Sequence, residues 1–150
     1  MDADITIAPV TAADEAEWRR LWAGYCAFYQ VDLPEAVTAG TWTRILDPES
    51  PVHGLIARGP DGRGVGLCNY VLHENTWSLA PVCYLEDLFT DSVFRGKGIG
   101  RAMIQRLQAL ARAQGWRHVY WHTNEDNKTA RALYDKVAGG RDPFVRYVLK

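Results

Sequence analysis

The sequence predicts a mixed α/β fold in which helices cover both faces of a central sheet. Two observations lead to this prediction. The apolar segments 52–58 and 64–73 flank a Gly-Pro-Asp-Gly turn at 59–62, a pattern typical of an antiparallel hairpin. In the second half of the chain strand and helix patterns alternate, and strand–helix–strand units indicate a parallel pairing. The elements follow the order β-α-α-β-β-β-α-β-α-β, which we assign to one domain of residues 1–150.

The N-terminal third is expected to contain one strand and two helices. Residues 5–10 alternate as a strand does, and residues 11–14 offer N-cap side chains for the helix that follows. In this helix apolar residues recur at spacings of three and four. The resulting stripe consists of Trp18, Leu21, Trp22, Tyr25, Phe28 and Tyr29. A second helix is expected from Pro34 to Leu46, because proline suits a first helical turn.

The rest of the chain is expected to alternate strands and helices. Residues 81–90 form a nearly unbroken apolar run, as expected for a central strand that is covered on both faces. A helix at 98–114 is indicated by an apolar face. This face consists of Ile99, Met103, Leu107 and Leu110. A short strand at 118–123, a helix at 127–137 and a last strand at 144–149 complete the prediction.

The composition is that of a globular protein without a strongly charged partner. Hydrophobic residues make up 47% of the chain and the formal net charge is -1, which argues against disorder and against a nucleic-acid or membrane partner. We see no signal-peptide pattern and no apolar run near the ~20 residues of a membrane helix. Cys26, Cys68 and Cys83 form no CxxC pair, so we expect buried thiols in a reducing cytoplasm, with no disulfide framework and no metal site.

A glycine-rich segment, Arg-Gly-Lys-Gly-Ile-Gly at 95–100, connects the central strand to the helix at 98–114. Its glycines let backbone N–H groups approach a ligand without obstruction by a Cβ atom. The N-terminus of the helix adds unpaired N–H donors and the positive end of the helix dipole. Arg95, Lys97 and Arg101 add positive charge. These parts together predict a binding site for pyrophosphate.

Two common phosphate-binding motifs do not fit this segment. A nucleotide P-loop needs Ser or Thr after its lysine and a glycine five residues before it, whereas Lys97 is followed by Gly98 and preceded at that distance by Ser92. The dinucleotide fingerprint GxGxxG needs a glycine where Arg101 stands. A nucleotide-binding module is therefore disfavoured.

The remaining pattern is Arg or Gln followed by x-x-Gly-x-Gly, with Arg95, Gly98 and Gly100. In this pattern and its position the sequence resembles the GNAT acetyltransferase superfamily. The resemblance implies that the loop binds the pyrophosphate of coenzyme A and that acetyl-CoA is the cofactor. The implied contacts are Arg95, Gly96, Lys97, Gly98, Ile99, Gly100 and Arg101. The alternative is a surface loop in which the glycines serve only turn geometry.

A second segment, residues 127–134, resembles the N-x-x-A-x-x-(L/F)-Y segment of the same family. Asn127, Ala130 and Tyr134 lie at i, i+3 and i+7, on one face of the predicted helix, where Ala130 leaves room for a ligand. The resemblance implies that all three contact the cofactor and that Tyr134, near the CoA sulfur, protonates the departing thiolate as general acid. The alternative is a Tyr134 that belongs to the core, with its hydroxyl at the surface.

The resemblance also assigns a role to the end of the central strand. In the family the pantetheine arm of CoA lies beside this strand and pairs with its backbone like an added strand. The implied partners in this chain are Leu88, Phe89 and Thr90. A backbone N–H near Leu88 would then polarise the thioester carbonyl.

Two consecutive acids, Glu86 and Asp87, interrupt the same apolar strand. An unpaired buried carboxylate is costly, so both need a partner, solvent or a function. Strict alternation places them on opposite faces, with Glu86 on the face of Tyr84 and Leu88. We take Glu86 as the base that removes the proton of the amine, directly or through a water, with a structural ion pair as the alternative. The weaker candidates are two histidines, His73 and His122.

The segment Leu-Glu-Asp-Leu-Phe at 85–89 and the glycine loop are similar to one branch of the superfamily, the spermidine/spermine acetyltransferases and the fungal histone-and-polyamine acetyltransferases. Residues 143–147 resemble the fungal group as well. The resemblance implies an N-acetyltransferase that acts on a primary amine, and a homodimer that pairs through C-terminal strands. The expected acceptor is a polyamine, an amino acid or another small amine. The alternatives are a protein lysine or N-terminus, and a non-catalytic CoA-binding module on the same fold.

The acceptor pocket is expected between the first helices and the central strand. The residues proposed to line it are Tyr25, Tyr29, Glu86 and Asp87. The alternative for the two tyrosines is a place in the core, which is the commoner fate of an aromatic helical stripe.

Overall fold

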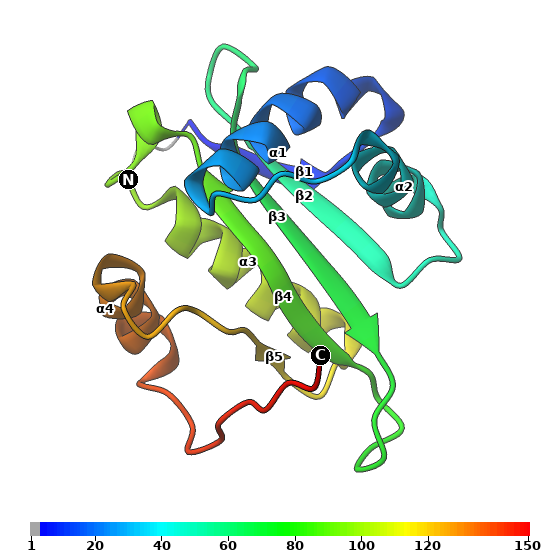
Figure 1. Ribbon diagram of the computed structural model, residues 1–150, viewed down its shortest axis with the longest axis vertical. Helices are drawn as coiled ribbons and strands as arrows, with labels where there is room; N and C mark the ends of the chain where they lie inside the picture. The colour runs from blue at the N-terminus through cyan, green and yellow to red at the C-terminus, as the bar shows by residue number, and fades with distance from the viewer. Residues whose placement is uncertain (1–3) are drawn as a thin grey trace.

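A five-stranded mixed sheet forms the centre of the fold (Figure 1). The computed structural model describes residues 4–150. The strands lie side by side in chain order: β1 (Thr6–Pro9), β2 (Val52–Arg58), β3 (Gly64–His73), β4 (Val82–Thr90) and β5 (Val119–Tyr120). Neighbours from β1 to β4 are antiparallel, whereas β5 is parallel to β4. The predicted hairpin and the predicted parallel unit are therefore both confirmed.

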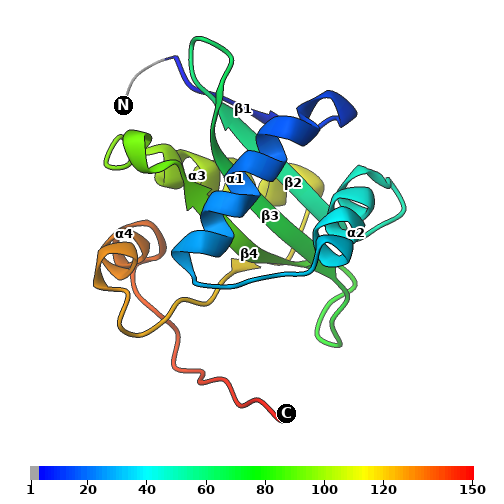
Figure 2. The same ribbon diagram turned by 45° about the horizontal axis from the view of Figure 1, so that its top comes forward.

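Helices cover both faces of this sheet, as predicted (Figure 2). On one face lie α1 (Glu15–Phe28) and α2 (Glu35–Leu46), and on the other lies α3 (Ile99–Gln114). The segment that contains α3 connects β4 to the parallel strand β5, and a parallel pairing requires such a crossover. The helix α4 (Lys128–Ala138) follows β5.

The aromatic stripe of α1 forms the core between α1, α2 and the sheet. Trp18 is completely buried, and its ring lies 5.5 Å from that of Trp22 and 5.2 Å from that of Trp42 in α2. Before α1, a short 3₁₀ turn, η1 (Ala12–Asp14), is closed by the N–H of Thr11, which donates to Oδ2 of Asp14 at 2.7 Å. This contact orients the chain as it enters α1.

The core on the other face is built by α3. Ile99, Met103 and Leu107 are at most 2% exposed and pack on the strand residues of this face, which confirms the predicted apolar side of the helix. Burial of each such side chain stabilises the fold by about 1.5–3 kcal/mol. The end of α3 is marked by Gly115, whose φ of 73° lies in the left-handed region.

Two predicted strands differ from the structure. The segment 118–123 forms only the two-residue strand β5, and 144–149 forms no strand. In 144–149 the apolar side chains are exposed: Phe144, Val145, Tyr147, Val148 and Leu149. An alternating apolar pattern predicts a tendency to form a strand, but a strand also needs a neighbour that supplies hydrogen bonds. The prediction of a last strand was therefore wrong for this chain taken alone.

Two further findings concern the part of the chain that the structure describes. Within 4–150, no helix combines the length and the apolar character that crossing a membrane requires. In the same range no three side chains of His, Cys, Asp or Glu come together as metal ligands would. The three cysteines are free thiols, and Cys68 and Cys83 are buried, as expected.

Candidate active site

The two acids of β4 lie at an irregularity in the pairing of β3 and β4. Asn69 pairs with Asp87, but the next residue of β3, Tyr70, pairs with Leu85, so Glu86 has no partner across the ladder. This is the arrangement of a β-bulge, which redirects side chains and is common next to active sites. Because of it Leu85 and Leu88 both pack into the core on the α3 side.

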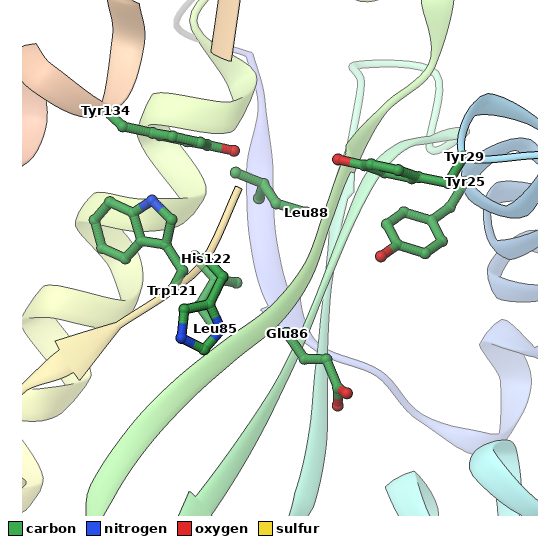
Figure 3. Close-up of a pocket in the computed structure, with 8 residues that line it drawn as sticks. All are labelled: Tyr25, Tyr29, Leu85, Glu86, Leu88, Trp121, His122 and Tyr134. Atoms are coloured by element: carbon green, nitrogen blue, oxygen red, sulfur yellow. The ribbon is translucent and has the colours of Figure 1, made fainter. Parts of the chain in front are cut away.

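The bulge corrects one prediction. Strict alternation placed Glu86, Tyr84 and Leu88 on one face, but the shift in register puts Leu88 on the face of Leu85, which is opposite to that of Tyr84. The carboxylate of Glu86 points away from Tyr134, and its side chain is exposed (Figure 3). A bulge depends on pairing between strands, so the local pattern of polar and apolar residues does not reveal it.

Asp87 is the buried member of the pair, with 8% of its surface exposed. The Nδ2 group of Asn69 donates to Oδ2 of Asp87 at 3.2 Å, and Oδ1 of Asn69 accepts from Nε1 of Trp18 at 3.3 Å. Burial raises the pKa of Asp87 to about 6 against the lowering effect of hydrogen bonding with Tyr25 and Asn69, and the neighbouring charge of Glu86 adds to the rise. Asp87 of β4 is therefore connected, through Asn69 of β3, to Trp18 of α1.

A small pocket lies where α1, β4, β5 and α4 meet (Figure 3). Its lining consists of Tyr25, Tyr29, Leu85, Glu86, Leu88, Trp121, His122 and Tyr134. Its free volume is about 20 Å³, enough for about one water molecule. The hydroxyl groups of Tyr29 and Tyr134 point toward one another across it, with Leu88 between them.

The pocket brings together five residues predicted for the site: Tyr25, Tyr29, Glu86, Leu88 and Tyr134. Sequence reasoning missed Leu85 and Trp121, and it rated His122 only as a weak candidate. The signal for Trp121 was its position directly after β5, which pairs in parallel with Cys83 and Tyr84 and so brings the next residue beside the middle of β4. Asp87 and His73 do not line the pocket.

Tyr134 reaches the pocket from α4. Burial raises its pKa to about 12, with a smaller contribution from Tyr29, and its ring lies edge-on to Trp121 at 5.5 Å between centroids. Asn127, which is predicted to contact the cofactor, stands at the start of α4. Its Oδ1 accepts from the N–H of Ala130 at 3.3 Å and caps α4, and its side chain does not line the pocket.

The glycine loop follows β4 and a short 3₁₀ turn, η2 (Ser92–Phe94). Gly96 and Gly98 have φ angles of 77° and 81°, in the left-handed region that favours glycine. A Cβ atom at Gly96 would meet nothing within 4 Å, so the backbone there is open to a ligand. Gly98 is also the N-cap of α3, whose first N–H groups have no acceptor within the helix. The loop therefore has the backbone of an anion site.

Arg95, the first residue of the predicted pattern, contacts both α1 and β4. Its Nε donates to the carbonyl of Thr90 at 3.1 Å, and its guanidinium lies 4.9 Å from the ring centre of Phe28 and 5.5 Å from that of Phe89. These contacts tie the loop to α1 and β4. Lys97 remains at the loop surface, where its Nζ lies 5.3 Å from the ring centre of Phe94.

Comparison with known proteins finds a matching family model and several similar N-acetyltransferases. Residues 15–139 match the model described as Acetyltransferase (GNAT) family. The chain is 33% identical over 135 residues to a D-amino-acid N-acetyltransferase from Saccharomyces cerevisiae, covering 89% of this chain and 84% of the relative. It is 28% identical over 132 residues to an aminoglycoside N(6')-acetyltransferase type 1 from Stenotrophomonas maltophilia, covering 86% and 82%.

Solved structures share the fold at lower identity. The structure of AAC(6')-Iy in complex with the bisubstrate analogue CoA-S-monomethyl-acetylneamine has a TM-score of 0.82 and 18% identity, covering 99% of this chain and 98% of that one. A probable acetyltransferase has a TM-score of 0.86 and 20% identity, covering 97% of both chains. The expected mixed α/β architecture is thus a known acetyltransferase fold.

Proposed function

Since the chain belongs to the GNAT acetyltransferase family, we propose that it transfers the acetyl group of acetyl-CoA to a small primary amine. One observation supports this most directly. The glycine loop and the pocket with Tyr134 and Glu86 lie at successive positions along the second half of β4 and its exit. A cofactor held at the loop and extended along β4 would bring its reactive end to the pocket.

The loop residues fit the pyrophosphate of acetyl-CoA. The left-handed backbone at Gly96 and Gly98 and the open N-terminus of α3 present N–H groups, while Lys97 and Arg101 add positive charge. Bound acetyl-CoA supplies an activated acyl carbonyl. The further contacts that we propose are Leu88, Phe89, Thr90, Arg95, Ile99, Gly100, Asn127, Ala130 and Tyr134.

We assign the two proton transfers to Glu86 and Tyr134. Glu86 is freed from the ladder by the bulge and lines the pocket, so its carboxylate can take the proton of an entering ammonium group directly or through one water. Tyr134 holds its proton at neutral pH, as an ordinary tyrosine does, and burial raises its pKa further, to about 12. Its hydroxyl can therefore donate to the leaving thiolate.

The charge of the pocket supports a cationic acceptor. In the described range 4–150 no lysine or arginine lines it, while Glu86 does, and Asp87 lies behind Tyr25. An ammonium group gains from these carboxylates, whereas the α-carboxylate of an amino acid would find no lysine or arginine in the lining. We therefore infer that a diamine or polyamine is preferred over an α-amino acid, with Tyr25 and Tyr29 as walls of the acceptor pocket.

The exposed apolar side chains of 144–149 support the homodimer. β5 is the last strand of the sheet, and a groove of about 520 Å³ between α3, β5 and α4 runs beside it. Residues 144–149 of a second copy, paired as a strand, would cover such an edge. Deletion of 141–150 should then turn a dimer into a monomer in light scattering; an unchanged mass would contradict this proposal.

A cytoplasmic location is supported by the thiols. Cys68 and Cys83 are buried and Cys26 is partly buried, and all three are free. Unpaired thiols persist in a reducing compartment. Fractionation of cells that express the tagged protein tests this proposal, and recovery outside the cytoplasm would contradict it.

The first experiment measures CoA release with acetyl-CoA and a panel of diamines, polyamines, amino acids and lysine peptides. Release that depends on a polyamine would support the whole proposal. Release that depends only on amino acids would overturn the acceptor inference but keep the transferase. The loop is tested separately, because Gly98→Glu places a bulky carboxylate in it and should abolish CoA binding.

A further inference from the structure

One face of α1 contacts the cofactor loop, which we define as residues 91–98. Arg20, Gly24 and Phe28 lie at i, i+4 and i+8 and therefore share this face. We propose that Arg20 is a positioning residue for acetyl-CoA, which holds the start of the cofactor loop in its binding conformation. The proposal rests on the function proposed above, because that function assigns the loop to the cofactor.

Arg20 anchors the start of the loop through Asp91. Nη1 of Arg20 lies 3.0 Å from Oδ2 of Asp91, whose side chain is only 15% exposed. The other carboxylate oxygen of Asp91 accepts from the N–H of Val93 at 3.3 Å and caps η2. Arg20 is itself fixed, because Nε donates to Glu17 at 2.8 Å and Nη2 donates to the carbonyl of Gly64 at 2.5 Å. Both oxygens of Asp91 are thus engaged, and the direction of η2 depends on them.

The same face of α1 contacts the middle of the loop. Phe28 lies under the guanidinium of Arg95, which also donates to the carbonyl of Thr90. Between these two anchors the helix comes so close to β4 that a Cβ atom at Gly24 would lie 2.8 Å from the ring of Phe89. Two contacts with α1 therefore position the loop. The contact between Arg20 and Asp91 is the one that pairs opposite charges.

Apart from α1, the loop is held by few contacts: the N–H of Asp91 donates to the carbonyl of Val65 at 2.9 Å, and Phe94 packs on the core. Its residues from Arg95 to Gly98 are exposed, so few buried contacts fix the backbone N–H groups that would meet the pyrophosphate. A loop that must be ordered during binding lowers the affinity by the cost of that ordering. Loss of the Arg20 anchor should therefore weaken cofactor binding. It should leave turnover at saturation nearly unchanged, because Arg20 does not line the pocket.

The test compares Arg20→Met with Arg19→Met. Methionine keeps an apolar stem and removes the charge. Arg19 is a matched control on the same helix, since it also pairs with two carboxylates, Glu15 at 2.9 Å and Glu35 at 2.8 Å, away from the loop. We expect R20M to bind CoA about tenfold more weakly in calorimetry and to raise the KM for acetyl-CoA by a similar factor, with kcat within about twofold. R19M should match the unchanged protein.

Hydrogen exchange supplies a readout that does not depend on activity. Amides of 91–98 should exchange faster in R20M than in R19M or the unchanged protein. Asp91→Asn should weaken CoA binding in the same way, and R20M combined with D91N should bind no more weakly than R20M alone. If R20M fails to fold, D91N and the conservative R20K carry the same comparison.

Two results would overturn the proposal: a folded R20M that binds CoA as tightly as the unchanged protein, or unchanged exchange across 91–98. An unchanged protein that does not bind CoA would instead refute the cofactor assignment of the loop. The exchange comparison would still decide whether Arg20 orders it. The two failures are therefore distinguishable.

Discussion

Replacement of Asp87 by asparagine should stabilise the protein at neutral pH. The carboxyl of Asp87 is 8% exposed, and burial raises its pKa from 3.8 to about 6. Between these values the folded state binds more protons than the unfolded chain, so the free energy of unfolding falls as the pH rises. Two pKa units correspond to about 3 kcal/mol at neutral pH, of which about 1.4 kcal/mol develops between about pH 5 and pH 7.5.

The assay is urea unfolding of both proteins at these two pH values. The advantage of Asp87→Asn over the unchanged protein should grow by about 1.4 kcal/mol from the lower pH to the higher. Asparagine retains an oxygen that can accept from Asn69, so other contributions largely cancel in the difference. Asp32→Asn, at an exposed aspartate, serves as the control and should show no such growth. An Asp87→Asn advantage that is independent of pH would refute the reasoning from burial.

Three other predictions concern the loop and the proton transfers. Gly98→Ala should lower the free energy of unfolding by roughly 1–2 kcal/mol and weaken CoA binding. Gly62→Ala, at the same φ of 81° in the hairpin turn, should lose similar stability but bind CoA normally. Equal losses of CoA binding in calorimetry would contradict the loop assignment. Tyr134→Phe should reduce kcat by about a hundredfold or more with little change in the Kd for acetyl-CoA, and unchanged turnover would remove Tyr134 as the acid. Glu86→Gln should slow turnover and shift the pH–rate profile, and an unshifted profile would end its assignment as base.

Much of the fold could be predicted because local pattern determines local structure. The hairpin 52–58 and 64–73 was predicted with its observed bounds from two apolar segments and the turn residues between them. The apolar face of α3 followed from helical periodicity, and the predicted end of the helix at 114 is the observed one. The cofactor loop was found in the same way, since glycines, cations and a helix start are contiguous in the chain.

The details of the pocket could not be predicted in this way, because they depend on pairing between distant segments. The bulge that frees Glu86 and turns Leu88 exists only through the register of β4 on β3. The guanidinium of Arg95 is held by Phe28, far away in the sequence. No local pattern reports either contact.

The sequence by itself therefore determined the order of strands and helices as far as α4, the glycine loop at the start of α3 and the candidate residue types for acetyl transfer. Only the tertiary structure decided which of these side chains meet. It brought Tyr29, Glu86 and Tyr134 to one pocket, buried Asp87 behind Tyr25 and left 144–149 exposed. The physical reason is that periodicity specifies which face of an element is apolar, whereas packing between elements determines what that face contacts.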